Sequence, residues 1–146
     1  MSTATTSTTG RQESRNAGRI NRASFGLVIM LIVQFVLGAA YNLYGTAPKS
    51  GKPIGMFSSP LLAIHVILGI LLILAAIDLL VRAIRASLTP AVVTSAVGLL
   101  AIIAAAGAGS GFTRDGANGA SFGMALATGI AMLAYLMNLR QPRGNG

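Results

Sequence analysis

Residues Ser59 to Arg85 read SPLLAIHVILGILLILAAIDLLVRAIR, and this stretch decides the fold. It opens with Ser59 and Pro60, a pair typical of the cap and first position of a helix. The apolar residues that follow extend for the roughly 20 positions that a helix needs to cross a hydrocarbon core of about 30 Å. Arg82 and Arg85 close the stretch. The pattern predicts a membrane-spanning helix.

The composition of the 146-residue chain agrees with a membrane protein. It is 53% hydrophobic and 10% charged, whereas a soluble domain is about 25% charged. The formal net charge is +8, but the basic residues sit mainly at the ends of apolar runs. This distribution favours topology signals and attraction to anionic lipid over binding of nucleic acid. The chain has no cysteine, which excludes disulfides, thiolate metal sites and thiol catalysis.

Three further apolar runs accompany the first. We expect spans at about residues 23–44, 60–82, 90–109 and 119–139. Four spans with short connections predict an all-α, four-helix transmembrane bundle with up-down-up-down topology.

The remaining residues are predicted to be tails. Residues 1–22 are Ser/Thr-rich and then basic, and without apolar periodicity they are expected to form a disordered cytoplasmic tail. Residues 140–146 are expected to form a second, short cytoplasmic tail. Gly38 and Ala40 could mark a signal-peptide cleavage site, but the apolar run continues past them, which favours a retained helix.

The basic residues orient the bundle, because cytoplasmic connections carry an excess of lysine and arginine. We expect both termini to be cytoplasmic and the protein to lie in the cell membrane. The cytoplasmic side then holds Arg11, Arg15, Arg19, Arg22, Arg82, Arg85, Arg140 and Arg143, and the outer side holds Lys49, Lys52 and Arg114. Aromatic residues are expected at the outer interface, namely Tyr41, Tyr44, Phe57, Phe112 and Phe122.

Small residues recur in the third and fourth spans. Gly119, Gly123, Ala127 and Ala131 repeat every four residues, and residues 104–109 are all alanine or glycine. Small residues let helix backbones approach closely in lipid. We expect the third and fourth helices to pack tightly, with a homodimer face as the alternative use of these residues.

His65, the only histidine, lies inside the second span. An ionisable residue within a membrane is a candidate functional residue by default. One interpretation is a neutral imidazole that is hydrogen-bonded to Gln34, a tyrosine or a carbonyl group. A second is an axial ligand of haem b, with Met124 at about the same depth as the other ligand. A quinone contact or pH sensing by His65 stays open, and a methionine on an apolar helix is otherwise a packing residue.

Other polar residues within the spans are fewer. Asp78 precedes Arg82 by four residues, a spacing that suits an ion pair, although a proton or cation site is the alternative. Gln34 and Thr128 lie nearer the midplane and could form hydrogen bonds between helices. The sequence contains no Ser/His/Asp pattern, carboxylate pair or cluster of metal ligands, so we do not expect an enzyme.

The segments FVLGAAYNLYG, LLAIHVILGILLIL and FTRDGANGASFGMALATGIAMLAYL resemble a group of small four-helix bacterial membrane proteins of unknown function, over residues 25–139. More distantly, QFVLG and IHVILG resemble one four-helix half of the haem A synthase family. In that family, histidines on the second and fourth helices bind haem. His65 matches the first of them, whereas the fourth helix of this chain has no histidine.

Together these features predict a non-enzymatic structural or accessory component of a membrane complex. Its partners would be the lipid bilayer and either other membrane proteins or a second copy of the chain. The alternatives are a haem-binding electron-transfer protein that uses His65, and a small transporter that uses Asp78.

Overall fold

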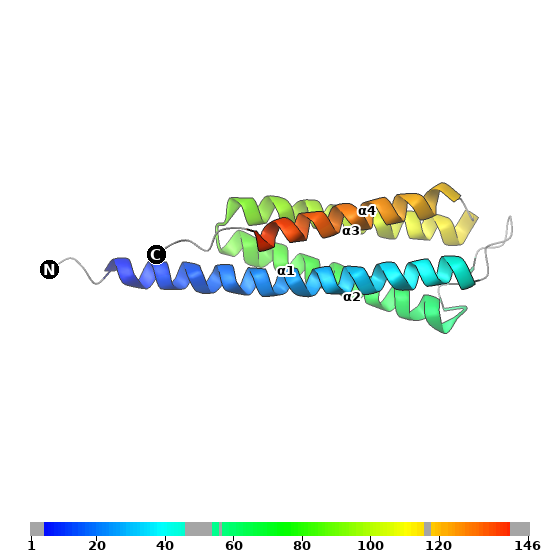
Figure 1. Ribbon diagram of the computed structural model, residues 1–146, viewed down its shortest axis with the longest axis horizontal. Helices are drawn as coiled ribbons and strands as arrows, with labels where there is room; N and C mark the ends of the chain where they lie inside the picture. Colours follow the sequence, from blue (N-terminus) through cyan, green and yellow to red (C-terminus); the bar gives the residue numbers. More distant parts are fainter. Residues whose placement is uncertain (1–4, 46–53, 56, 116–117, 141–146) are drawn as a thin grey trace.

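A computed structural model of the protein describes residues 5–45, 54–55, 57–115 and 118–140. This part of the chain forms four helices and no strand: α1 (Thr5–Tyr44), α2 (Pro60–Arg85), α3 (Thr89–Asp115) and α4 (Asn118–Leu139). All four are long and apolar enough to cross a membrane. They alternate in direction within one elongated bundle, so that α1 begins and α4 ends toward the same side (Figure 1). The predicted all-α, four-helix transmembrane bundle is confirmed, and the chain is a multi-pass membrane protein.

The four helices form a closed ring in cross-section. Within the described residues, α1 packs against α2 and α4, and α3 packs against the same two helices, without contact across either diagonal. The interface between α3 and α4 is the most extensive of the four. This confirms the tight pairing that the small residues of these two helices predicted.

Helix α1 begins at Thr5, not near Ala23 as the sequence pattern predicted. Residues 5–22 are therefore helical where a disordered tail was expected. No proline interrupts them, and a helix already nucleated in its membrane segment gains one hydrogen bond for each residue added. At 1.5 Å per residue, the 40-residue helix is about 60 Å long, and its first part extends past the other three helices (Figure 1).

Other bounds also differ from the expected spans. Helix α2 continues to Arg85 and α3 to Asp115, because no proline stops either helix at the predicted ends, residues 82 and 109. The predicted tail at residues 140–146 lies outside the described residues except for Arg140. Lys49, Lys52 and Arg143, which contributed to the predicted orientation, also lie outside them.

Local signals set the ends of α2. The Ser59 hydroxyl accepts a hydrogen bond from the Leu62 amide at 3.2 Å, and Pro60 occupies the first turn, as predicted. At the other end, the Ala86 amide donates to the Arg82 carbonyl at 3.0 Å. Ser87 then adopts a left-handed backbone with φ of 54°, which reverses the chain into α3 within three residues.

Apolar side chains cover the outside of the bundle as well as its interior. Leu100, Leu133 and Leu74 are more than half exposed, as expected of side chains that face lipid. Tyr44 and Phe122 are also exposed near the end opposite Arg82 and Arg85, which fits the predicted aromatic belt.

Tyr41 does not belong to that belt, because its side chain is buried with 8% of its surface exposed. It follows Gln34 and Gly38 at helical spacing and so shares the inward face of α1. Tyr41 lies three residues before the end of α1, near the predicted depth, but its side chain faces the bundle and not the lipid.

The α3–α4 interface depends on one glycine that the sequence did not single out. Tyr135 of α4 is fully buried, and a Cβ atom added to Gly98 of α3 would lie 2.5 Å from its Cζ atom. A side chain at position 98 would therefore overlap the ring. Gly107, on the same helix, has nothing within 4 Å of such an atom.

These two glycines give a matched test of the packing. We expect Gly98→Ala to lower the free energy of unfolding by about 1–3 kcal/mol, since the buried ring must move to admit the methyl group. Gly107→Ala should leave it nearly unchanged. Unfolding of both variants in detergent micelles, followed by circular dichroism, measures the difference. Equal effects of the two substitutions would contradict the close approach of α3 to Tyr135.

Candidate functional site

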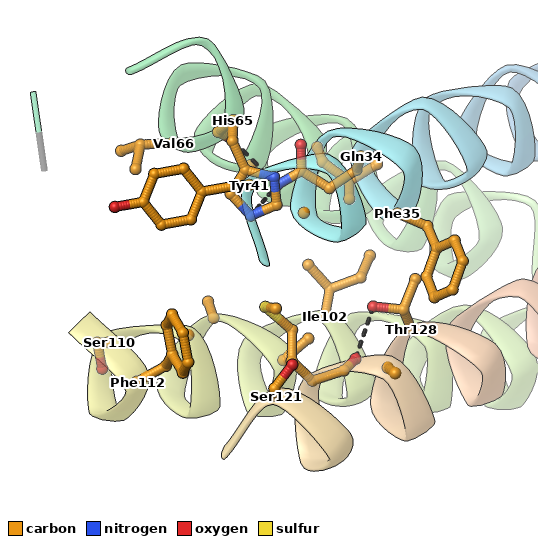
Figure 2. Close-up of a pocket in the computed structure, with 18 of the residues that line it drawn as sticks. Gln34, Phe35, Tyr41, His65, Val66, Ile102, Ser110, Phe112, Ser121 and Thr128 are labelled. Atoms are coloured by element: carbon orange, nitrogen blue, oxygen red, sulfur yellow. Dashed lines mark hydrogen bonds between the residues drawn. The ribbon is translucent and has the colours of Figure 1, made fainter. Parts of the chain in front are cut away.

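A cavity of about 420 Å³ lies between the four helices, in the half of the bundle away from Arg82 and Arg85. Residues 31–42 of α1, 62–73 of α2, 102–113 of α3 and 121–128 of α4 contain its lining (Figure 2). Small-molecule sites span about 300–1,000 Å³ and combine apolar walls with a few polar groups. The cavity has both properties, because most of its lining is aliphatic or aromatic and His65 and Gln34 project into it.

His65 of α2 and Gln34 of α1 form a hydrogen-bonded pair on one wall of the cavity (Figure 2). The Gln34 Nε2 atom donates to the main-chain carbonyl oxygen of His65 at 3.0 Å. It also lies 3.3 Å from the Nε2 atom of the imidazole ring. The predicted interaction of His65 with Gln34 is confirmed.

This geometry assigns the proton on the imidazole. A carbonyl oxygen only accepts hydrogen bonds, so the contact at 3.0 Å fixes which end of the Gln34 amide faces His65. The same NH₂ group then donates its second hydrogen to the ring Nε2, which must be unprotonated to accept it. The proton of the neutral imidazole is therefore assigned to Nδ1.

The pair leaves two polar atoms without a partner. Among the described residues, His65 Nδ1 and Gln34 Oε1 are buried and make no hydrogen bond. An unpaired buried polar group costs about 1–3 kcal/mol. Neighbouring protein atoms enclose both of them, so neither atom borders the open space of the cavity.

Glycines create the space around the pair. A Cβ atom on Gly38 of α1 would lie 3.1 Å from His65 Cε1, and one on Gly69 of α2 would lie 3.1 Å from Gln34 Nε2. Each glycine thus faces the polar residue of the opposite helix. Each also follows the polar residue of its own helix by four positions, because the segments read Gln34-Phe-Val-Leu-Gly38 and His65-Val-Ile-Leu-Gly69.

Met124 of α4 reaches the same cavity, as its predicted depth implied. Its Cε atom lies 3.8 Å from the position of a Cβ on Gly38, beside His65. Its sulfur, however, lies 3.4 Å from the corresponding position on Gly109 of α3. The Met124 side chain thus extends from Gly109 to Gly38, and the ring Nε2 of His65 faces Gln34. The two predicted haem ligands thus meet at Gly38, and whether they bind haem stays a prediction.

Thr128 lines the cavity and is buried, but it makes no hydrogen bond between helices within the described residues. Its hydroxyl donates to the Met124 carbonyl of its own helix at 2.8 Å. The interhelical hydrogen bond predicted for Thr128 is therefore not found there. A hydroxyl can satisfy itself within one helix in this way, so a threonine alone does not indicate a contact between helices.

Asp78 and Arg82 form the predicted ion pair on α2, with the Arg82 Nε atom 2.7 Å from the Asp78 carboxylate. Both side chains are about half exposed, and neither lines the cavity. The pair is a surface feature of the helix.

Sequence reasoning missed a second polar group near the arginine-rich end. Asn138 of α4 is buried, accepts a hydrogen bond from the Thr94 hydroxyl and donates to the Ser95 hydroxyl of α3 at 3.2 Å. An asparagine this close to the end of an apolar run is typical of the membrane interface, so its burial could not be predicted from the hydropathy pattern. Side-chain hydrogen bonds of this kind join helices within a membrane.

No protein-family profile, no curated protein and no solved structure matches this chain.

The single histidine makes the assigned tautomer measurable. In protein labelled with ¹⁵N-histidine, we expect one ring with a protonated Nδ1 and an unprotonated Nε2. Gln34→Leu removes the donor to Nε2 and should abolish the preference for this tautomer, which the ¹⁵N chemical shifts report directly. Thr128→Val, at another polar position of the cavity, serves as the control. In this variant the ¹⁵N chemical shifts of His65 should stay those of a ring with a protonated Nδ1. A protonated Nε2 in the unaltered protein would overturn the assignment.

Proposed function

We propose that this protein is a non-enzymatic component of the cell membrane that holds an apolar small molecule between its four helices. The observation that carries this proposal is the apolar cavity of about 420 Å³ between the four helices, with His65 and Gln34 in its wall. The surrounding apolar walls favour a ligand that partitions into the bilayer.

The lining of the cavity supports binding more than chemistry. The described residues that line it include no carboxylate, lysine or arginine. Acid–base catalysis needs a group that donates or accepts a proton at the reacting atom. His65 is the strongest such group present, and Gln34 already engages one of its two nitrogens.

Little of the described chain lies outside the four helices, which supports an accessory role in a larger membrane assembly. The connection between α2 and α3 is only Ala86 to Leu88. A partner would therefore contact the sides of the helices within the membrane or the part of α1 that extends past the other three helices. Migration of the mildly solubilised protein as a single chain, with no partner, would count against this role.

A cavity-filling substitution tests the ligand-binding function. Decylbenzene, an apolar probe, should raise the midpoint of thermal unfolding of the unaltered protein, because a ligand that binds the folded state stabilises it. Gly38→Leu places a side chain against His65 Cε1 and should remove most of this shift. Gly26→Leu is the control, since a Cβ on Gly26 of α1 meets nothing within 4 Å. No stabilisation of the unaltered protein by any apolar probe would refute the function.

The second candidate function is haem-mediated electron transfer, which the meeting of His65 and Met124 at Gly38 favours. His65 Nε2 would have to leave Gln34 before that atom could bind iron, so we rank it below the first. The absorption spectrum of protein expressed with ample haem tests it. A haem ligand at His65 predicts a Soret band that His65→Ala removes, and a spectrum without that band would exclude this role.

Transport through Asp78 gains no support from the site, because this carboxylate is paired with Arg82 on the helix surface.

A further inference from the structure

We propose that the arginine-rich end of the bundle binds the headgroups of anionic phospholipids in the leaflet around it, through exposed arginines of α1, α2 and α4. These lipids lie against the outside of the helices, so their binding does not depend on what the cavity holds. The proposal follows from the level at which the arginines lie along the bundle and from the direction in which those of α1 face.

The register between α1 and α2 can be followed from the cavity to the arginine-rich end. Gly38 of α1 faces His65 of α2. The two helices run in opposite directions (Figure 1), so each step toward the start of α1 matches a step toward the end of α2. The same number of steps from each residue sets Ile20 of α1 level with Ala83 of α2. Both belong to one cluster of buried residues, as this register requires.

Arginines flank this layer on both helices in the same way. Ile20 and Ala83 each have one arginine immediately before them and a second two positions after them. Because the two layer residues are level with one another, their flanking arginines are level within about one helical turn. These four exposed arginines are Arg19, Arg22, Arg82 and Arg85.

Helix α4 adds a fifth exposed arginine near this level. Arg140 comes two residues after Asn138, whose amide donates to the Ser95 hydroxyl of α3 at 3.2 Å. Arg140 therefore lies about level with Val93, near the start of α3. Helix α3 itself has no basic residue before Arg114, at the opposite end of the bundle. The five arginines, which we call the arginine collar, thus lie on three of the four helices.

The arginines of α1 face the lipid and not the bundle. Arg19 and Arg22 are three positions apart, and the exposed side chains of Phe25 and Ile29 follow Arg22 by three and seven positions. Residues three and four apart share one face of a helix. The two arginines therefore continue the lipid-facing side of α1 past its apolar part. An arginine can keep its stem along apolar surface while its charge reaches the headgroups.

The chain itself offsets little of the charge of the collar. Among the side chains that the structure describes, Asp78 is the only acidic one, and its carboxylate pairs with Arg82 at 2.7 Å. A phosphate group is a good external partner, because a guanidinium can donate two parallel hydrogen bonds to its oxygens. Each basic residue near an anionic membrane surface also gains electrostatic free energy.

The arrangement of the collar favours lipid over an acidic protein. Its arginines project from three helices at one level near the ends of the apolar spans, which is the level of the headgroups. A single protein partner would contact one side of the bundle, whereas lipid surrounds it.

The chain has no tryptophan, so one introduced tryptophan reports on the lipids beside a chosen helix. Phe25→Trp places it on α1 near Arg22, and Val93→Trp places it on α3 at the level of Arg140. Both positions are more than half exposed. Each variant is reconstituted in mixtures of phosphatidylcholine and phosphatidylglycerol. Quenching of its fluorescence by the brominated form of either lipid gives the ratio of their binding constants at that position.

We expect phosphatidylglycerol to bind about fivefold more tightly than phosphatidylcholine beside Phe25→Trp, the effect of one arginine near an anionic surface. Beside Val93→Trp the ratio should be about one. Adding Arg19→Gln and Arg22→Gln to Phe25→Trp should remove most of the preference. Arg114→Gln, at an exposed arginine of the other end, is the matched control and should leave it unchanged.

Three results would overturn the proposal. Equal preference beside both tryptophans would show attraction to the net charge of the whole protein and not to the collar. A preference that survives Arg19→Gln and Arg22→Gln would exclude these two arginines as its cause. No preference beside Phe25→Trp would exclude anionic lipid and leave the collar to an acidic protein surface. The comparison of the two tryptophans needs no arginine variant, so a misfolded variant would not obscure it. None of these results bears on the ligand of the cavity.

Discussion

The constraint on which this structure depends is the absence of water within the hydrocarbon layer. A backbone or side-chain polar group there must find its hydrogen bond inside the protein or go without one. The four helices satisfy the backbone. Most polar side chains of the spans then follow the same rule in one of two ways. Thr128 bonds within its own helix, whereas Asn138 joins α4 to α3 through Thr94 and Ser95.

Gln34 and His65, in the wall of the cavity, use only part of their hydrogen-bonding capacity. Gln34 and His65 satisfy one another through the amide NH₂ group, but the opposite ends of both side chains stay unpaired. Ser24 and Tyr135 also carry unpaired buried oxygens, but neither residue lines the cavity. The His65–Gln34 pair differs from these two residues by its position in the wall of the cavity, and the apolar cavity itself is the basis for assigning a ligand to this place.

The crossed arrangement of polar residues and glycines explains how two antiparallel helices build such a pair. Gln34 faces Gly69, and His65 faces Gly38. In each helix a glycine follows the polar residue by four positions and so lies on the same face. Because α1 and α2 run in opposite directions, the polar residue of each helix then lies opposite the glycine of the other. Close approach of backbones through small residues is the usual basis of helix association in lipid. In this bundle it also admits polar side chains between the helices.

The sequence by itself determined the spans, their alternation and the chemistry available, because these depend on local hydropathy and composition. It also determined the Ser59 cap and the Asp78–Arg82 ion pair, which depend on neighbours three or four positions apart. It did not determine the start of α1 at Thr5, since helix extension from a membrane anchor overrides weak local preference. Only the tertiary structure decided that Tyr41 turns inward, that Gly98 admits Tyr135, and that Met124 and His65 meet at Gly38. Those facts depend on how four nearly featureless apolar helices are rotated about their axes, and the hydrophobic pattern of a helix surrounded by lipid carries little information about that rotation.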